Sequence, residues 1–352
     1  MTFRPAVEAD ASAWQAFLAR QPSGDFLHDW VWAEVAAFDG QPQRRFVLAD
    51  GETILALAAT QVRRLPVGRA FWYVPHGPVL DYGADEAGDR LRAVVRGLAG
   101  AGAADAAIAV RFEPRLEAGS GELASFARLR LRRVDAALQV GQTRIVELGD
   151  DEALIAGFDK DTRYGVRRAE REGVRVAICD DASDVRPIDE LHALVAETQH
   201  RAGFPLPPID RYRTAWRALG SAGRAAILEA RRDGELLASA MVVIEGDRSF
   251  YLFSGSRREA PGEPKHYASY ALQWAMMQHA RDRGARFHDL WGVAPSGAGP
   301  DHPWHGVGLF KKGFGGREVV WAGSWDIVVD RTLYRLREAA SIMRGWVAKL
   351  RR

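Results

Sequence analysis

Residues 225–245 read AAILEARRDGELLASAMVVIE and carry the clearest fold signal in the chain. Two apolar runs, 225–230 and 236–245, flank the turn Arg232-Asp233-Gly234. Asp-Gly between two such runs predicts a β-hairpin, because both residues tolerate the positive φ angles of a tight turn. The predicted elements that follow are a strand over 248–253, a loop over 254–256, a helix over 267–283 and a strand over 286–290.

The same order of elements occurs about 180 residues earlier in the chain. Runs at 45–49 and 53–63 flank the turn Asp50-Gly51-Glu52, and the predicted elements after them are a strand over 70–74, an irregular loop over 75–78, a helix over 86–99 and a strand over 107–112. Prolines in the loop interrupt strand pairing. Two copies of one α+β acyltransferase-like unit explain this repeated pattern.

The predicted domains are 1–148 and 149–328, followed by a C-terminal helix over 329–352 that packs back on the body. A chain of 352 residues exceeds one ordinary hydrophobic core, which agrees with two domains. The apolar stripe of the last segment is more typical of packing against protein than of binding to lipid.

Composition excludes several classes of protein. No apolar run of about 18 residues exists, and no apolar signal core follows Met1, so we expect a cytoplasmic protein. The single cysteine, Cys179, excludes an internal disulfide and is expected to be structural. The formal net charge of +2 is not that of a DNA-coating protein, and nine scattered histidines predict no metal site.

The stretch GLFKKGFGG at 308–316 is the most specific candidate for chemistry. Its glycines permit positive φ and close approach of the backbone to a ligand. A lysine held there, Lys311 or Lys312, could neutralise a phosphate or the oxyanion of an acyl transfer. The alternative is a glycine-rich turn with solvated lysines.

Three further segments offer candidate ligand contacts. In 72–79 (WYVPHGPV), prolines around a glycine predict a rigid rim that presents Tyr73 and His76 to a ligand, although a lone loop histidine is usually structural. Arg163 belongs to a basic helical turn that fits either RNA phosphates or a solvated face with ion pairs. Arg201 fits either a diphosphate ligand or a helix C-terminus.

The segment before the helix predicted over 267–283 argues against coenzyme A as the acyl donor. Acetyltransferases of the GNAT type bind the pyrophosphate on a loop resembling [RQ]-x-x-G-x-[GA]. Residues 255–265 read GSRREAPGEPK, whose prolines lack amide donors, and no G-x-[GA] precedes Tyr267. The corresponding place at 78–86 lacks the motif as well. We therefore expect no bound cofactor.

Over about residues 24–325 the chain resembles the FemABX family of non-ribosomal peptidyl transferases, which build peptidoglycan interpeptide bridges. The matching pieces occur in the family's order: Phe26-Leu27 with Trp32, Tyr73 to Pro78, Thr162-Arg163-Tyr164, Arg167 to Glu170, Thr198 with Arg201 and Gly203-Phe204, Tyr251 with Ser254 to Ser256, Asp289 to Gly292, and Phe310 to Gly316.

This resemblance implies two tandem GNAT-like domains of the α+β class, without a coiled-coil arm. It implies transfer of Gly, Ala or Ser from aminoacyl-tRNA, as co-substrate, to the stem-peptide amine of a UDP-linked or lipid-linked muropeptide precursor, with a peripheral contact to the inner membrane face possible for a lipid-linked acceptor. The first domain would serve the precursor and the second the tRNA. In the family, residues matching Phe310 and Lys311 line the donor site, and Arg201 matches a diphosphate-binding arginine.

Further positions follow from the resemblance. Glu113 matches the family's acidic strand end, one methylene longer, and is a candidate proton acceptor, with His76 as the alternative. The expected substrate-binding set is Arg201, Tyr73, His76, Tyr251, Trp32 and Arg163. Ala36 stands where the family often has a phosphate-binding lysine four residues after the tryptophan, which argues against a soluble nucleotide acceptor and leaves a lipid-linked one open. The alternatives are a GNAT-like enzyme with another activated acyl donor and a non-catalytic scaffold that binds precursor or tRNA.

Overall fold

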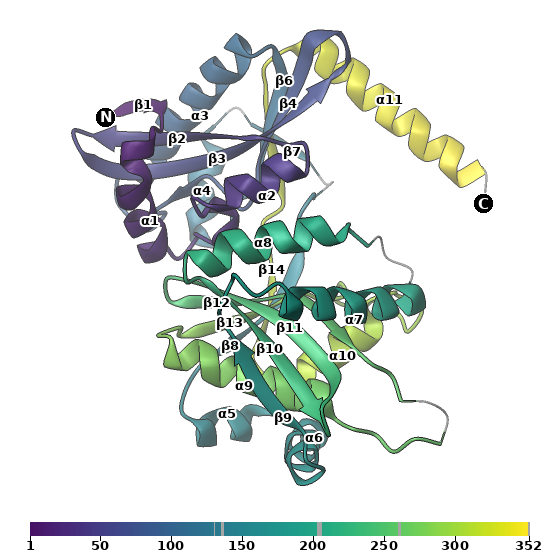
Figure 1. Cartoon of the computed structure of the whole chain (residues 1–352). Coiled ribbons are helices and arrows are strands. Elements are labelled where there is room, and N and C mark those ends of the chain that lie inside the picture. Colours follow the sequence, from purple (N-terminus) through teal and green to yellow (C-terminus); the bar gives the residue numbers. More distant parts are fainter. Residues whose placement is uncertain (130, 135–136, 203–205, 260–261, 351–352) are drawn as a thin grey trace. The chain divides into compact units, whose positions relative to one another are not determined.

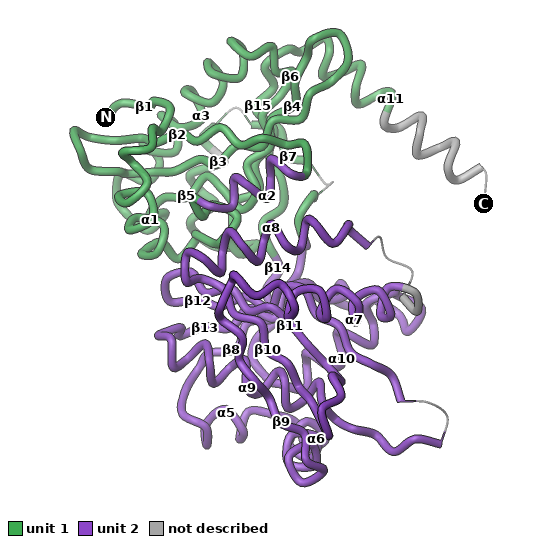
Figure 2. The backbone as a smooth tube through the Cα atoms, in the orientation of Figure 1, with its two compact units in different colours: residues 1–30, 39–139, 321–352 green, residues 31–38, 140–320 purple. Residues whose placement is uncertain are grey.

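The computed structural model describes residues 1–129, 131–134, 137–202, 206–259 and 262–350. Contacts divide the chain into two compact units, coloured separately in Figure 2. Unit 1 comprises residues 1–30, 39–139 and 321–352, and unit 2 comprises 31–38 and 140–320. Each unit is built around one mixed sheet (Figure 1).

The sheet of unit 1 has the strand order β1-β2-β3-β4-β6-β15-β7, with β5 paired to β3. Its strands are β1 (Thr2–Pro5), β2 (Gln43–Asp50), β3 (Thr53–Leu65), β4 (Arg69–Val74), β5 (Val79–Leu80), β6 (Ala107–Phe112), β7 (Arg132–Val134) and β15 (Ser324–Val328). Its helices are α1 (Ala11–Arg20), α3 (Ala87–Ala104), α4 (Ala124–Ala127) and α11 (Arg331–Leu350). The strands β4 and β6 are parallel, whereas the neighbouring pairs are antiparallel.

Alternation along β4 distributes its side chains between two cores, because successive strand residues face opposite sides of the sheet. Trp72 and Val74 pack in the cluster that contains Leu91, Val94 and Leu98 of α3. Phe71 and Tyr73 pack in a second cluster with Tyr334, near the start of α11. The start of α11 therefore packs on unit 1.

The sheet of unit 2 has the strand order β14-β8-β13-β12-β11-β10-β9. Its strands are β8 (Gln142–Glu147), β9 (Arg175–Cys179), β10 (Ala225–Arg232), β11 (Glu235–Glu245), β12 (Arg248–Ser256), β13 (Phe287–Gly292) and β14 (Arg317–Val320). Its helices are α2 (Trp32–Phe38), α5 (Asp151–Gly157), α6 (Lys160–Arg171), α7 (Arg186–Ala202), α8 (Ile209–Ser221), α9 (Ala268–Asp282) and α10 (His305–Gly313). Here β12 and β13 form the parallel pair.

The predicted repeat is confirmed by these two topologies. The hairpins β2/β3 and β10/β11 both form, and each is followed by a strand, an irregular loop, a helix and a parallel strand. The Asp233-Gly234 turn connects Arg232 directly to Glu235, with positive φ at both central residues. That geometry is the one that favours Asp-Gly in a two-residue hairpin loop.

Each sheet contains one strand that the predicted domain boundaries assign to the other domain. In each sheet an antiparallel strand lies beside the parallel pair, namely β15 in unit 1 and β8 in unit 2. The predicted boundaries at 148 and 328 would assign β8 to the first domain and β15 to the second. The contacts place each strand in the other unit, because that is where its backbone hydrogen bonds are made.

No helix among the described residues combines the length and the apolar character that crossing a membrane would require.

Candidate functional site

A pocket of about 620 Å³ lies in unit 2 where the parallel strands β12 and β13 separate. The pair is in register from Arg248 opposite Phe287 to Phe250 opposite Asp289, and both strands continue beyond that point. Their released ends supply pocket walls, with Tyr251 and Phe253 from β12 and Trp291 from β13. Separation of two parallel strands thus converts a sheet interior into a binding surface.

Two further elements complete this pocket. Helix α10 contributes Gly306, Val307, Phe310 and Lys311, with Trp304 just before it, and α7 contributes Thr198. The lining is largely aromatic and aliphatic, with hydroxyl groups from serines of β12 and α9. An apolar cleft with a few convergent polar groups is typical of a small-molecule site.

Lys311 is the charged group among the described residues that line the pocket, and it is 6% exposed. Its Nζ donates to the carbonyl oxygen of Gly292 at 2.7 Å and lies 3.5 Å from that of Trp291. The Tyr251 ring centroid lies 5.7 Å from the same atom. Burial lowers the pKa of Lys311 to about 8, opposed by the negative charge of Asp289. The ammonium is thus held by backbone dipoles with one side toward the pocket.

The glycine-lysine stretch is a helix followed by a turn, which corrects the prediction of a loop. Phe310, Lys311 and Lys312 lie in the last turn of α10, and Gly315 and Gly316 have φ of +75° and +70°. A Cβ on Gly316 would lie 2.3 Å from the carbonyl oxygen of Ile145. The glycines therefore bring the backbone close to other protein segments, and not to a ligand as predicted.

Phe310 lines the pocket and packs edge-to-face on Tyr270 and Phe314, with ring centroids 5.3 and 5.1 Å away. This aromatic cluster fixes the end of α10 and therefore the backbone that carries Lys311. Lys312, the other candidate, is exposed. Of the residues predicted from the sequence, the structure brings Lys311, Phe310 and Tyr251 together.

Tyr73 and Glu113 meet inside unit 1. The Tyr73 hydroxyl donates to Oε2 of Glu113 at 2.8 Å, and the backbone N–H of Gln139 donates to the same oxygen at 2.9 Å. Oε1 accepts from the Leu138 amide and the Ser324 hydroxyl, both at 2.7 Å. Because each carboxylate oxygen already has two donors, a proton acceptor at Glu113 would have to give up one of these hydrogen bonds.

The segment predicted as a ligand rim is buried in unit 1, which corrects the prediction that its side chains are presented to a ligand. Tyr73 is 1% exposed and His76 is 3% exposed. Nδ1 of His76 contacts the buried Asp25, and the His76 ring lies beside Trp321. The prolines and the glycine of this loop let it pack inside the unit, so the same rigidity serves the core.

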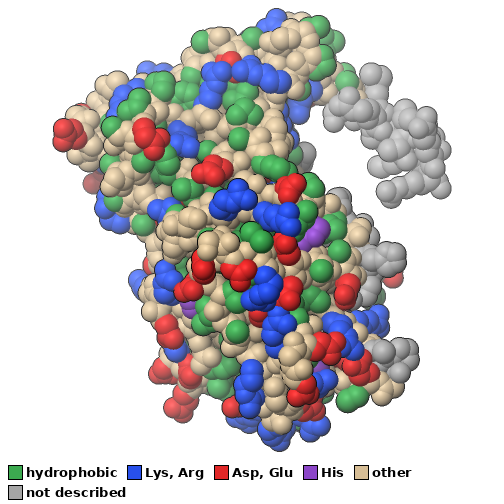
Figure 3. All heavy atoms as spheres, viewed as in Figure 1, with side chains coloured by type: hydrophobic (Ala, Val, Ile, Leu, Met, Phe, Trp, Pro, Cys, Tyr) green, Lys and Arg blue, Asp and Glu red, His purple; other side chains and the backbone are tan. Residues whose placement is uncertain are grey.

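The remaining predicted positions also lie in unit 2, and of these Trp32 and Arg163 do not line the pocket. Trp32 is buried in α2, which packs against α8. Arg163, in α6, donates to the carbonyl oxygen of Phe158. Arg201 is in the last turn of α7, one turn after the pocket residue Thr198, and its side chain is outside the described residues. On the face drawn in Figure 3, basic and acidic side chains are interspersed over both units.

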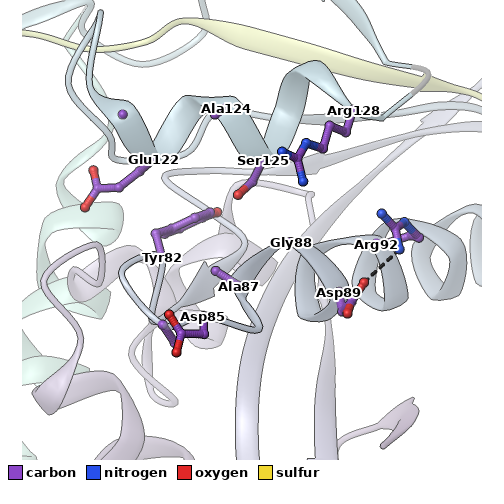
Figure 4. Close-up of a pocket in the computed structure, with 12 residues that line it drawn as sticks. Tyr82, Asp85, Ala87, Gly88, Asp89, Arg92, Glu122, Ala124, Ser125 and Arg128 are labelled. Atoms are coloured by element: carbon purple, nitrogen blue, oxygen red, sulfur yellow. Dashed lines mark hydrogen bonds and ion pairs between the residues drawn. The ribbon is translucent and has the colours of Figure 1, made fainter.

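Unit 1 has a pocket of its own, of about 430 Å³, at the start of α3 (Figure 4). Tyr82, Asp85 and Gly88 line one side and the segment from Gly121 to Arg128 lines the other. Arg92 is paired with Asp89 at 2.7 Å. No residue predicted as a functional site lines it. Its charged groups have both signs, so it shows no preference for an anion.

Sequence reasoning missed Asp289, Trp291 and Trp304 as parts of the site. Trp291 and Trp304 line the pocket. Asp289 is buried beneath it and accepts a hydrogen bond from the Trp291 amide at 2.8 Å. The signal for two of them was the Asp289-Leu290-Trp291-Gly292 motif, which carried the family resemblance without a stated role.

Comparison with known proteins agrees with this architecture. The model of the FemAB family matches residues 222–341, which include the pocket strands and α10. A UDP-N-acetylmuramoylpentapeptide-lysine N(6)-alanyltransferase of Weissella viridescens is 26% identical over 294 residues, covering 80% of this chain and 83% of that protein. The chain is therefore similar to members of the FemABX family.

Two further similarities extend over almost the whole chain. A lipid II:glycine glycyltransferase of Staphylococcus saprophyticus is 23% identical over 399 residues, covering 93% of each protein. The crystal structure of FemX superposes with a TM-score of 0.86 at 20% identity, covering 96% of this chain and 99% of that one. The predicted pair of GNAT-like α+β domains is thereby confirmed for this chain.

Proposed function

We propose that this protein is a member of the FemABX family and transfers an amino acid from aminoacyl-tRNA to the stem-peptide amine of a peptidoglycan precursor. The observation that carries the proposal is the buried Lys311 ammonium, anchored on backbone carbonyls in a pocket formed by separated strands. The relatives named as an alanyltransferase and a glycyltransferase support the class of reaction.

In the proposed step the acceptor amine attacks the carbonyl carbon of the aminoacyl ester. A C–N bond forms while the C–O bond to the ribose breaks, the amine loses a proton and the ribose oxygen gains one. The ester is already activated, so alignment supplies much of the rate. Negative charge develops on the former carbonyl oxygen, and Lys311 is placed to stabilise it in a largely apolar pocket.

The amino acid is Gly, Ala or Ser, and the acceptor is a UDP-linked or lipid-linked muropeptide. We propose no bound cofactor, and aminoacyl-tRNA is the co-substrate. A lipid-linked acceptor would bring the protein to the inner face of the membrane. We assign precursor binding to the first domain and donor binding to the second, where the Lys311 pocket lies. Arg201, Trp32 and Arg163 remain predicted substrate contacts.

A reconstituted assay tests this function. Purified protein is mixed with charged tRNA and either muropeptide precursor, and the product is measured by mass spectrometry. We expect the precursor to gain one aminoacyl mass with one of the three tRNAs. Acetyl-coenzyme A in place of charged tRNA should give no product. Acetylation without aminoacylation would contradict the tRNA donor, and binding without any transfer would favour the scaffold alternative.

Within that assay, Lys311→Ala should lower kcat by about 100-fold or more, the typical effect of removing an oxyanion-stabilising donor. Lys312→Ala is the matched control, since Lys312 is the exposed neighbour on the same helix. Wild-type turnover by Lys311→Ala would exclude the assigned role. Muropeptides from a strain lacking the protein should also lose the added amino acid.

A further inference from the structure

The end of β13 has an unusual backbone that a buried carboxylate holds in place. Trp291 has φ of +61°, in the left-handed region that non-glycine residues rarely adopt. The register between β13 and β8 is interrupted between Asp289 and Gly292. Asp289, 2% exposed, accepts from the Trp291 amide at 2.8 Å and from the Thr143 hydroxyl of β8. Strained conformations of this kind persist where neighbouring contacts fix them.

This bend determines where two carbonyl groups point. The carbonyl oxygens of Trp291 and Gly292 lie 3.5 and 2.7 Å from Nζ of Lys311. A regular strand would direct successive carbonyls to opposite edges of β13, where β12 and β8 lie. The bend brings both toward one lysine. A buried ammonium needs such acceptors, because leaving its donors unpaired is costly.

We propose that Asp289 is a positioning residue for Lys311: it fixes the bend whose carbonyls hold the ammonium and supplies the negative charge that keeps this group protonated. Asp289 does not line the pocket and so acts through Lys311 without touching substrate. The inference rests on the proposed function insofar as protonated Lys311 is taken to stabilise the oxyanion.

Two buried titratable groups near Lys311, His288 and Tyr251, are neutral at physiological pH. Burial lowers the pKa of His288, the neighbour of Asp289 on β13, to about 4. Burial raises the pKa of Tyr251 on β12 above its usual value. Asp289 therefore supplies the charge that opposes the desolvation of Lys311. Without it, the Lys311 pKa falls below about 8 and less of the lysine is protonated at neutral pH.

Asp289→Asn isolates this charge, because asparagine keeps an oxygen acceptor for Trp291 and Thr143. In the tRNA-dependent assay we expect the alkaline limb of the kcat profile to move down by about one pH unit. Asp289→Glu, which restores the charge, should move it back. Asp180→Asn removes an exposed carboxylate of the same unit and should leave the profile unchanged. An unshifted profile in Asp289→Asn would refute the electrostatic role.

A direct titration separates this inference from the proposed function. The chain has five lysines, namely Lys160, Lys265, Lys311, Lys312 and Lys349, so ¹³C-lysine labelling gives a simple NMR spectrum. Lys311→Arg assigns the signal. We expect Lys311 to titrate near pH 8 in the wild type and at lower pH in Asp289→Asn. An inactive wild type would refute the transfer function, whereas an unchanged Lys311 titration would refute the role of Asp289.

Thr143→Val gives the second variant should Asp289→Asn fail to fold. Loss of the hydroxyl releases one hydrogen bond that orients the carboxylate. The Lys311 titration should then move in the same direction by a smaller amount, and Thr143→Ser should restore it. A Lys311 titration that stays at its wild-type position in Thr143→Val overturns the proposal.

Discussion

The parallel strand pairs of the two units differ in how far they remain joined. In unit 1, β4 and β6 are paired to their ends, from Trp72 opposite Val110 to Val74 opposite Phe112, and the Glu113 amide extends the pairing to the Val74 carbonyl at 3.3 Å. In unit 2, β12 and β13 are paired for three positions and separate after Phe250 and Asp289. A pocket with a buried lysine lies where they separate.

The residues at the two strand ends explain this difference. Beyond β6, Glu113 gathers four hydrogen-bond donors and joins the loop after β7 to the sheet. Beside it, Arg111 and Tyr334 both bind the buried Asp326. At the end of β13 the carboxylate of Asp289 instead bends the backbone toward Lys311. In unit 1 the buried carboxylate of Glu113 therefore links the sheet to a loop. In unit 2 the buried carboxylate of Asp289 stabilises the backbone that holds Lys311.

Filling each pocket with a large side chain should give the largest difference in activity between variants of the two units. Gly306 and Gly88 are the second residues of α10 and α3, each lines its unit's pocket, and an added Cβ at either meets no atom within 4 Å. Gly306→Phe should lower kcat/KM in the tRNA-dependent assay by about 100-fold, because displaced substrate loses its alignment. Gly88→Phe should retain activity within about twofold, since displacement there leaves the Lys311 site intact. Loss of activity in Gly88→Phe with activity retained in Gly306→Phe would show that the active site lies in unit 1.

The turn after α10, which positions Lys311, should be the most sensitive backbone position of unit 2. Gly316→Ala combines a φ of +70° with a Cβ 2.3 Å from the Ile145 carbonyl oxygen, and should cost about 3 kcal/mol of unfolding free energy. Gly297→Ala is the control, with φ of +83° but open space, and should cost about 1 kcal/mol. Denaturant unfolding measures both, and equal costs would show that close packing of this turn is unimportant.

Most of the repeated fold was predictable because its signals are local. The strand predicted over 107–112 is β6 with those bounds, and all six of its residues are buried. Helix α10 was not predicted, since its glycines resemble a loop when packing is unknown. Position 313 requires glycine because a Cβ would lie 2.2 Å from the Thr162 hydroxyl oxygen. The exchange of β8 and β15 between the sheets depends on long-range pairing, which local patterns do not encode.

The same distinction applies to the site. Lys311 was predicted because lysine is scarce in the chain and this lysine stands beside several glycines. Asp289 was missed because its importance depends on partners far apart in sequence, Thr143 and Lys311. Tyr73 and Glu113 were predicted as separate substrate and catalytic contacts, but they bind one another. Family motifs therefore indicated which residues matter without indicating whether they face ligand or protein.

Replacing the carboxylate that closes unit 1 tests whether it is structural. Glu113→Gln places an amide group where at least one of four donors now points, and should lower the free energy of unfolding by about 2–3 kcal/mol. Glu52→Gln, at an exposed turn of the same unit, should change it by less than about 0.5 kcal/mol. Unchanged stability with a large loss of kcat would instead support Glu113 as the proton acceptor.

Acid should affect the two units through one buried histidine each. Burial lowers the pKa of both His28 in unit 1 and His288 in unit 2 from 6.5 to about 4. Each is neutral when folded but gains a proton on unfolding below pH 6.5, so stability falls as pH drops from 6.5 toward 4. The cost in unfolding free energy is about 2 kcal/mol per histidine at pH 5.

The hydrogen bonding of the two histidines differs. His288 contacts Ser249 and Gln273, both at 2.7 Å, whereas the His28 ring nitrogens have no hydrogen-bond partner among the described residues.

His28→Leu should therefore remove part of the acid sensitivity at little cost at neutral pH, because it leaves no broken hydrogen bond. Between pH 7.5 and 5.0 its free energy of unfolding should fall by about 2 kcal/mol less than that of the wild type. His288→Leu should be destabilised at both pH values, because Ser249 and Gln273 lose their partner. Urea unfolding at the two pH values measures each difference. An equal fall in His28→Leu and wild type would show that acid acts on unit 1 through groups other than this histidine.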